Sequence, residues 1–371
     1  MKSWTNLSYA NVATTSPAAH KASMKWSDAL ARGGAAEFSG EAEKNGMMPL
    51  RRAAARLLSC EVADVCVGSS ATELLCSLAW AVSPSGGSNI VSTRAAFPST
   101  VYPWSRVAEA NGAEIRLADH DEALYTNPDD ILDLIDDATS VVTLSHVEYS
   151  NGQRYDLRRF ADAAHSVGAL LVVDATQSMG MVPINAGLSG ADAIVSSGYK
   201  WLRGTYGAAV AYISPEIRGD LNPGLLGFRS HVDIWDLRAD RMELPEDASR
   251  FEYTTIHFGA VLGLAAAVEE INEIGIEEVW RHDLALADSV IDGAQRLSIE
   301  VASPLSDSER SAIVSLRLPE GVNSEEISHR LQDEYSILVT SRAGLLRVSP
   351  HIDNSPADVQ SLLEALKYLL S

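Results

Sequence analysis

The sequence predicts an α/β fold in which helices sandwich a mostly parallel sheet, followed by a smaller C-terminal α/β lobe. Short apolar runs alternate with helical patterns between residues 45 and 215, a pattern typical of parallel sheets buried on both faces. Residues 222–247 interrupt the alternation with turn formers, tryptophan and charge, and it resumes after about residue 285. A chain of 371 residues is long enough for one large and one smaller domain.

The individual elements follow from the period of the apolar residues. We expect helices at 49–58, 71–82, 102–111, 258–274 and 357–370, and strands at 65–67, 89–92, 114–117, 140–145, 169–174, 191–196, 208–213, 313–316 and 345–348. The small residues of helix 258–274 indicate close packing in the core or at a subunit interface. We expect an N-terminal segment near the active site (1–20), a large domain (21–250), and a linking helix with a small C-terminal domain (251–371).

The composition disfavours several classes of partner. A net charge of −21 argues against nucleic acid and against anionic membrane surfaces. No apolar run is long enough to cross a bilayer, and the N-terminus lacks the apolar stretch of a signal peptide, so we expect a cytoplasmic protein. Cys60, Cys66 and Cys76 form neither a disulfide framework nor a Cys-x-x-Cys pair, and we expect them to be buried.

A carboxylate and an amine follow the ends of two consecutive predicted strands. Asp174 closes the apolar run 170–174, and Lys200 lies in Ser197-Gly198-Tyr199-Lys200 after the next strand. Ligands of parallel sheets bind beyond the carboxyl ends of the strands. Pyridoxal phosphate needs an amine for its aldehyde and a carboxylate for its ring nitrogen, so this pair predicts that cofactor. The competing interpretations are a surface lysine and an aspartate that caps a turn.

A second motif, residues 68–73 (Gly-Ser-Ser-Ala-Thr-Glu), lies between a predicted strand and a predicted helix. A helix N-terminus with small hydroxyl residues can bind a phosphate, although Ser-x-x-Glu also forms ordinary capping boxes. Neither a Gly-x-x-x-x-Gly-Lys loop nor a Gly-x-Gly-x-x-Gly loop after a strand is present, which disfavours a nicotinamide dehydrogenase.

With these motifs the sequence resembles the class V (fold-type I) pyridoxal-phosphate enzymes, the aminotransferase and cysteine desulfurase family. It looks most similar to isopenicillin N epimerase-like and hercynylcysteine sulfoxide lyase-like proteins. The resemblance is most specific over 174–204 and over the Arg-x-Ser-Pro-His-x-x-Asn segment at 347–354. Residues 253–255 resemble a segment that reaches across a dimer to the partner's phosphate, so the resemblance also implies a homodimer.

The resemblance implies a role for each candidate site residue, and it implies no metal. The implied roles are Schiff-base lysine for Lys200, ring-nitrogen partner for Asp174, ring-hydroxyl contact for Gln177, phosphate contacts for Ala71, Thr72 and Ser197, ring stacking for Phe97, phosphate contact across the dimer for Thr255, substrate carboxylate binding for Arg347, and a place beside the cofactor for His146. Core packing remains an alternative for Phe97 and for His146, and a surface ion pair remains one for Arg347.

Two departures from the family pattern bear on the reaction. Tyr199, which the resemblance places among the cofactor-binding residues, stands where many relatives have histidine before the lysine, so its phosphate or proton contact differs from theirs. Cysteine desulfurases carry a persulfide-forming cysteine in the loop that corresponds to 340–344, and no cysteine follows Cys76 here. We therefore expect β-elimination from a cysteine-type substrate, a C–S lyase reaction at the α-carbon of an amino acid. Transamination, epimerisation and a non-catalytic binding role remain open.

Overall fold

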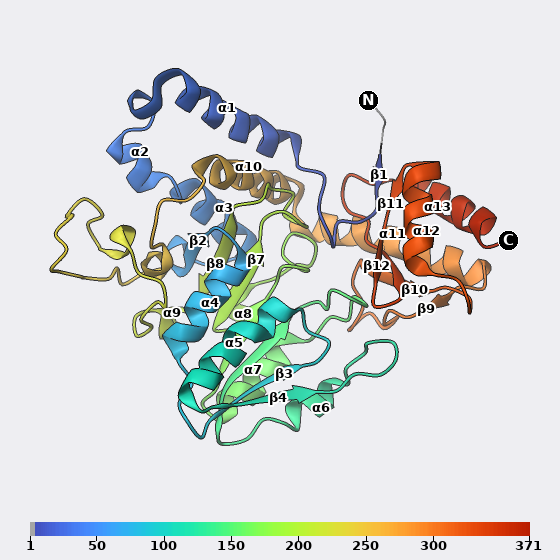
Figure 1. Cartoon of the computed structure of the whole chain (residues 1–371), viewed down its shortest axis with the longest axis horizontal. Coiled ribbons are helices and arrows are strands. Elements are labelled where there is room, and N and C mark those ends of the chain that lie inside the picture. The colour runs from blue at the N-terminus through green and yellow to red at the C-terminus, as the bar shows by residue number, and fades with distance from the viewer. Residues whose placement is uncertain (1–3) are drawn as a thin grey trace.

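A computed structural model describes residues 4–371, which form a large lobe and a smaller C-terminal lobe (Figure 1). The large lobe is built on a seven-stranded sheet with the order β2-β8-β7-β6-β5-β3-β4. Its strands are β2 (Val65–Gly68), β3 (Asn89–Thr93), β4 (Glu114–Ala118), β5 (Thr139–Ser145), β6 (Leu170–Asp174), β7 (Ala193–Ser197) and β8 (Ala209–Ile213). The fold is the predicted mostly parallel sheet between helices.

One strand of this sheet runs against the others. β8 pairs antiparallel with β7 and with β2. Parallel neighbours need a crossover of a dozen or more residues, usually a helix. The connection between β7 and β8, residues 198–208, contains no helix, so β8 returns beside β7 in the opposite direction. This short return carries Lys200.

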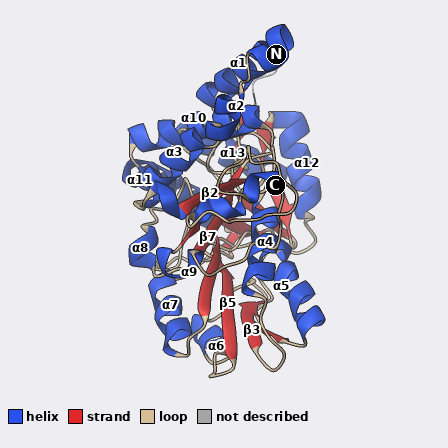
Figure 2. Cartoon of the chain, turned by 90° about the vertical axis from the view of Figure 1, so that its left-hand side faces the viewer, coloured by secondary structure: helices blue, strands red, loops and turns tan. Residues whose placement is uncertain are grey.

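Helices cover both faces of the sheet (Figure 2). Alternate strand residues pack on α3, α7 and α10 on one face, and the remaining ones pack on α4 and α5 on the other, as the two-residue period of a buried strand requires. The helices of this lobe are α1 (Pro17–Gly33), α2 (Gly40–Asn45), α3 (Met48–Leu58), α4 (Ala71–Val82), α5 (Pro98–Asn111), α6 (Pro128–Leu132), α7 (Leu157–Ser166), α8 (Ala186–Ser189), α9 (Pro215–Arg218) and α10 (Phe258–Ile274).

The C-terminal lobe packs helices on a four-stranded antiparallel sheet with the order β12-β13-β10-β9. Its elements are α11 (Ile276–Arg296), β9 (Glu300–Val301), β10 (Val314–Arg317), α12 (Ser324–Tyr335), β11 (Ile337–Leu338), β12 (Thr340–Arg342), β13 (Leu345–Val348) and α13 (Pro356–Leu369). α10 is the helix expected to link the two lobes; its apolar side chains pack in the core of the large lobe, whereas most of those of α11 pack in the core of the C-terminal lobe.

The N-terminal segment joins the two lobes. β1 (Thr5–Asn6) pairs parallel with β11 of the C-terminal lobe. The chain then passes the lysine loop, where the Ala13 amide donates to the Tyr199 carbonyl at 3.0 Å and the Ser16 amide donates to the Arg203 carbonyl at 2.9 Å. Within the described residues, the segment thus lies against the loop that carries Lys200, and residues 1–3 of the predicted segment lie outside them.

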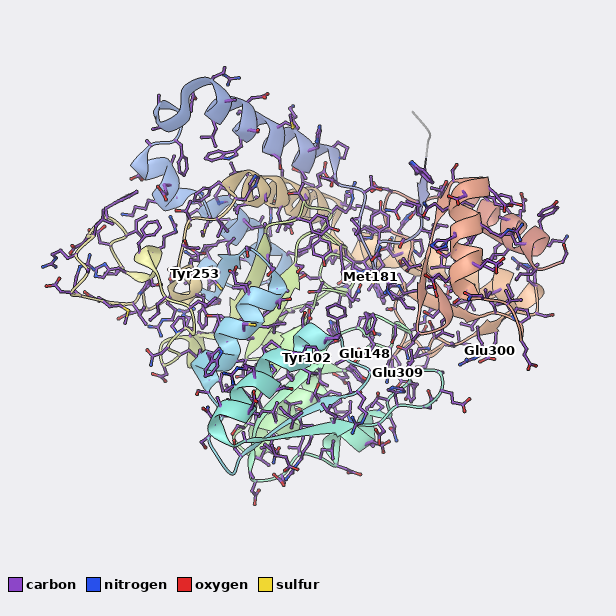
Figure 3. All side chains as sticks on the ribbon, viewed as in Figure 1. Tyr102, Glu148, Met181, Tyr253, Glu300 and Glu309 are labelled. Carbon is purple, nitrogen blue, oxygen red and sulfur yellow. The ribbon has the colours of Figure 1, made fainter. Side chains whose placement is uncertain are left out.

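The 148–154 turn forms a second junction between the lobes. The Ser311 hydroxyl donates to the Gly152 carbonyl at 2.7 Å, and the Ser315 hydroxyl donates to the Ser150 carbonyl at 2.6 Å. Figure 3 shows Glu148, Met181 and Glu309 where the two lobes meet. A Cβ atom on Gly152 would lie 2.4 Å from the Ile313 carbonyl oxygen, so this junction has no space for a side chain.

The composition led us to expect three buried cysteines and no membrane-spanning helix. Cys66 is buried, whereas Cys60 and Cys76 are only partly so, and all three are free thiols. Among residues 4–371, no helix has the length and apolar character that a bilayer span requires.

Gly152→Ala tests the junction. Gly152 has φ +76° and the close carbonyl contact, whereas Gly321 has φ +84° with nothing near its Cβ direction, so Gly321→Ala isolates the backbone cost. We expect Gly321→Ala to lower the free energy of unfolding by about 1–2 kcal/mol. Gly152→Ala should lower it by about 2–5 kcal/mol, because the added methyl group also pushes the two lobes apart. Urea denaturation measures both. Equal losses in the two variants would contradict a tight junction at Gly152.

Candidate active site

The site is a pocket at the carboxyl edge of the large sheet, where β2, β5, β6 and β7 end. The β5–β6 register pairs Ser145 with Asp174, and the β6–β7 register pairs Asp174 with Val195, so the two polar strand ends are neighbours. The predicted residues that line this pocket are Ala71, Thr72, Phe97, Asp174, Gln177, Ser197, Tyr199 and Lys200. Ser99, Ser145, Val147, Tyr149 and Thr176 complete the lining.

Lys200 is the one buried lysine in the described part of the chain. Its exposed fraction is 8%, whereas Lys21, Lys25, Lys44 and Lys367 are exposed. Burial lowers the pKa of Lys200 to about 8; the Asp174 charge opposes this shift, and the charges of Arg347 and Arg342 add to it. A neutral amine is therefore accessible near neutral pH, as a nucleophile or a general base requires.

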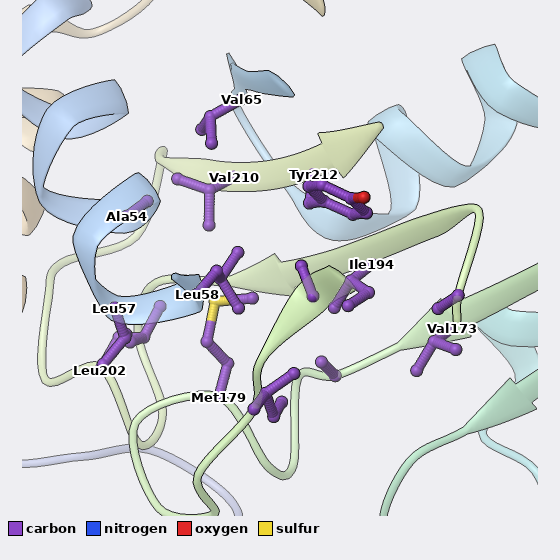
Figure 4. Packing of buried hydrophobic residues seen from close by; sticks show 14 of the residues in the cluster. Ala54, Leu57, Leu58, Val65, Val173, Met179, Ile194, Leu202, Val210 and Tyr212 are labelled. Carbon is purple, nitrogen blue, oxygen red and sulfur yellow. The ribbon is translucent and has the colours of Figure 1, made fainter. Parts of the chain in front are cut away.

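The loop around Lys200 is held by packing on its neighbours. A Cβ on Gly198 or Gly204 would lie 2.5 Å or 2.7 Å from a Leu264 methyl carbon, so the loop lies directly on α10. Leu202 packs with Leu57 of α3 in the same core (Figure 4). The lysine backbone is thus fixed while its side chain points into the pocket.

Asp174 is oriented by two hydrogen bonds. Its Oδ1 accepts from the Thr176 amide at 2.9 Å, and its Oδ2 accepts from the Thr100 hydroxyl at 3.1 Å. Sequence reasoning missed Thr100, which lies in the first turn of α5 and far from Asp174 in sequence. The only available signal was its place directly after the Phe97-Pro98-Ser99 segment.

A second carboxyl group, that of Glu148, lies next to Asp174 and was also missed. Glu148 is fully buried, and burial followed by the Asp174 charge raises its pKa to about 8. Within residues 4–371, neither carboxyl oxygen has a hydrogen-bond partner; the Tyr155 and Ser145 hydroxyls are close but lack hydrogen-bond geometry. Glu148 therefore holds a proton at neutral pH and places no negative charge beside Asp174.

The N-terminus of α4 forms the opposite wall. The Ala71 amide donates to the Ser197 hydroxyl at 3.2 Å, and the Thr72 hydroxyl donates to Ser99 at 2.9 Å. Ser70 caps the helix by accepting from the Glu73 amide at 3.2 Å. The structure thus shows the cap, whereas phosphate binding stays a prediction, for which the first turn presents small hydroxyl residues and a helix N-terminus to the pocket.

Arg347 lies behind the pocket on β13, with only 1% of its surface exposed. Its Nε donates to the Thr340 hydroxyl at 3.2 Å and its Nη1 donates to the Tyr149 carbonyl. Among the described residues, nothing accepts a hydrogen bond from its buried Nη2. Burial and then the Arg342 charge lower the pKa of Arg347 to about 9. A buried guanidinium with a free donor is stabilised by an anion such as a carboxylate.

Gln177 and Tyr199 lie in the pocket with defined orientations. The Gln177 amide nitrogen donates to the Ala10 carbonyl at 2.9 Å, and its oxygen accepts from the Trp201 indole at 2.9 Å. The Tyr199 ring stacks on Tyr206 with centroids 4.4 Å apart.

Two predicted residues lie elsewhere. His146 lines a separate cavity of about 390 Å³ with Arg154 and Tyr155, and burial together with the Arg154 charge lowers its pKa to about 3. His146 is thus buried in the wall of another cavity, and its place beside the cofactor stays a prediction. Thr255 lies outside the pocket and donates to the Glu43 carboxylate at 2.8 Å. Its role across a dimer stays a prediction.

The donor set fits pyridoxal phosphate. A buried amine, an oriented carboxylate, a helix N-terminus with hydroxyls and an aromatic ring meet around one space. The free volume is about 40 Å³, and Lys200 Nζ lies 5.5 Å from the Phe97 ring centroid in the same lining.

Known proteins agree with this assignment. The family model described as Aminotransferase class-V matches residues 12–362. A kynureninase of Deinococcus radiodurans is 30% identical over 289 residues, covering 75% of this chain and 68% of its own. A probable cysteine desulfurase of Methanothermobacter thermautotrophicus is 30% identical over 215 residues, covering 56% of this chain and 53% of that protein, about half of its length.

A solved structure shows the same fold. The cystine C-S lyase C-DES, in complex with its reaction product cysteine persulfide, superposes with a TM-score of 0.89 at 20% identity, covering 98% of this chain and 97% of that one. Fold and site define a pyridoxal-phosphate-dependent enzyme of fold type I. The chain belongs to the class V aminotransferase family. Its predicted closeness to the epimerase-like and hercynylcysteine lyase-like branch stays a prediction.

Glu148→Gln tests the buried proton. The pKa of Glu148 is about 8 in the folded protein and roughly 4.3 in an unfolded chain, so between these values the folded state binds one proton more. The contribution of Glu148 to the stability of the wild type therefore falls as pH rises from 5 to 8, by up to about 1.4 kcal/mol per pH unit, and a glutamine lacks this contribution. We expect the stability of Glu148→Gln relative to wild type to rise across this window in urea denaturation.

The matched control is the exposed Glu300→Gln, which removes a surface ion pair with Arg317 and should change stability by the same small amount at every pH from 5 to 8. Parallel curves for Glu148→Gln and wild type would show that Glu148 is already ionised.

Proposed function

We propose that the protein catalyses β-elimination from a cysteine-type amino acid and releases the sulfur substituent. The observation that carries this proposal is the pocket in which buried Lys200 and oriented Asp174 meet, with Arg347 behind it. The names of the matched desulfurase and of C-DES support a sulfur-containing amino acid as substrate. The loop 340–344 has no cysteine and none lines the pocket, which disfavours a persulfide held on the protein.

Each residue has a distinct task in this reaction. Arg347 binds the α-carboxylate through its free Nη2, and its burial strengthens the pairing. Lys200, with its lowered pKa, removes the proton from Cα and holds it on Nζ. Asp174 keeps the ring nitrogen protonated, and Thr100 and Thr176 hold its two oxygens in place. Bound pyridoxal phosphate supplies the electron sink for the Cα bond.

Transamination is the second candidate, because the matched family model is that of class V aminotransferases. The two reactions differ in where the proton held by Lys200 goes. Epimerisation returns it to Cα from the other face, and a non-catalytic binding protein would not remove it at all.

We also propose that the protein works as a cytoplasmic homodimer. Large apolar side chains on the irregular 222–247 stretch are 40% to 67% exposed: Leu226, Phe228, Val232, Trp235, Leu237 and Met242. Exposed apolar patches of this kind mark interaction surfaces, and Thr255 follows shortly after them in sequence. Three free thiols fit a reducing compartment. Sedimentation as a monomer at micromolar concentration would contradict the dimer.

The reaction is tested with the cofactor-loaded enzyme and S-ethyl-L-cysteine. We expect pyruvate and ethanethiol in equal amounts. Lys200→Ala should lower kcat by about 10²- to 10⁴-fold, the usual contribution of a general base. Lys367→Ala, which removes an exposed lysine, should leave kcat unchanged.

Other outcomes of the same assay would support one of the alternative reactions. Conversion of the cofactor to its amine form, with a keto acid that keeps the ethylthio group, would indicate an aminotransferase. Loss of optical activity without product would indicate an epimerase. Absence of any turnover over a panel of cysteine derivatives would contradict the proposal.

A further inference from the structure

A second cavity contains none of the residues that line the Lys200 pocket, and the proposed reaction does not use it. It has a volume of about 830 Å³, within the roughly 300–1,000 Å³ typical of ligand sites. It lies between the N-terminal segment, α12 and β12. Hydroxyl and amide side chains dominate its lining: Asn6, Ser8, Asn11, Thr14, Ser328, Gln332, Thr340 and Ser341.

Arg342 is the guanidinium in this lining, and the sheet register places it near Arg347. β12 pairs with β13 so that Thr340 faces Arg347 and Arg342 faces Leu345. Because side chains alternate along a strand, Arg342 and Arg347 lie on one face of this ribbon as diagonal neighbours. Diagonal neighbours are about 7 Å apart, so the two cations are close but separate.

Arg342 has no acidic partner among residues 4–371. Its Nη2 donates to the Asn11 side-chain oxygen at 3.0 Å and its Nη1 donates to the Ser341 carbonyl at 2.8 Å, and both acceptors are neutral. Other arginines of the same lobe, Arg317 and Arg330, pair with carboxylates. The positive charge of Arg342 contributes to the lowered pKa values of both Lys200 and Arg347.

The acidic group in the cavity wall does not neutralise this charge. Glu325 is exposed on the first turn of α12, and His329 lies one turn further along the same helix face. Thr340 of the cavity lining accepts a hydrogen bond from Arg347, so the unpaired cation Arg342 lies near a second cation in a chain whose net charge is −21. Such a local excess of positive charge favours a ligand with more than one anionic group.

We propose that Arg342 binds a second anionic group, carried by the side chain of the substrate. The substrate class is then a cysteine derivative whose sulfur substituent ends in a carboxylate or another acid. Arg347 holds the α-carboxylate while the substituent extends into the polar cavity, where the planar guanidinium of Arg342 pairs with its acid. This inference rests on the proposed function, because it assumes β-elimination as the reaction. The preference for an acidic substituent follows from Arg342 and the cavity.

A matched pair of substrates tests the charge. S-carboxymethyl-L-cysteine and S-carbamoylmethyl-L-cysteine are nearly the same size but differ by one negative charge. We expect the cofactor-loaded wild type to prefer the acid by at least tenfold in kcat/KM. Arg342→Gln should lower kcat/KM for the acid about 10- to 100-fold, as expected for a lost charge-assisted pair, and should leave the amide within about threefold.

The control variant is Arg330→Gln, which removes an exposed ion pair on α12 and should change neither substrate. Equal losses on both substrates in Arg342→Gln would overturn the proposal, because they would assign Arg342 to the α-carboxylate or to folding. Lack of preference for the acid in the wild type would overturn it as well.

A binding measurement separates this inference from the reaction. Calorimetry should show that glutarate, with two carboxylates, binds the cofactor-loaded wild type at least tenfold more tightly than pentanoate, and that Arg342→Gln abolishes this preference. If no cysteine derivative yields pyruvate but the preference is seen, the proposed reaction fails and the anion site stands. Equal binding of the two acids by the wild type would overturn the anion site itself.

Discussion

The rest of the site depends on the burial of one amine beside one carboxylate. β6 and β7 are neighbours in the sheet, so the residues that follow their carboxyl ends share a pocket. Burial of Lys200 lowers its pKa, and the Asp174 charge keeps that shift moderate. The same burial raises the pKa of Glu148, so this second carboxyl group places no negative charge beside Asp174 at neutral pH. The pocket is thereby suited to hold a flat ring between an amine and an acid.

The C-terminal lobe takes part in holding the lysine loop. His351 Nε2 contacts the Trp201 carbonyl at 2.9 Å, and its Nδ1 is 2.6 Å from the Asp283 carboxylate. Arg203 pairs with Asp353 at 2.7 Å on the other side of the loop. The lobe that supplies Arg347 for the substrate therefore also fixes the backbone next to Lys200. Movement of this lobe would change substrate binding and lysine position together.

Much of this architecture could be predicted from periodicity alone. The helices at 71–82 and 258–274 have the predicted bounds, because their apolar pattern ends in clear caps. The reversed direction of β8 could not be predicted from its composition, since it depends on the missing crossover. Pocket residues that follow a strand end were predictable. Thr100 was not, because only folding brings α5 to Asp174. Glu148 does follow the end of β5, but its full burial, which sets its protonation, is visible only in the structure. His146 alternates to the other side of the strand end from the pocket.

The most direct measurement is reduction of the pyridoxal-phosphate-loaded protein with borohydride, followed by peptide mass spectrometry. The account predicts one pyridoxyl group per chain, on Lys200. The other lysines among residues 4–371 are exposed, and none of them lines the pocket with Asp174. A modification on another lysine, or a protein that retains no cofactor under these conditions, would contradict it.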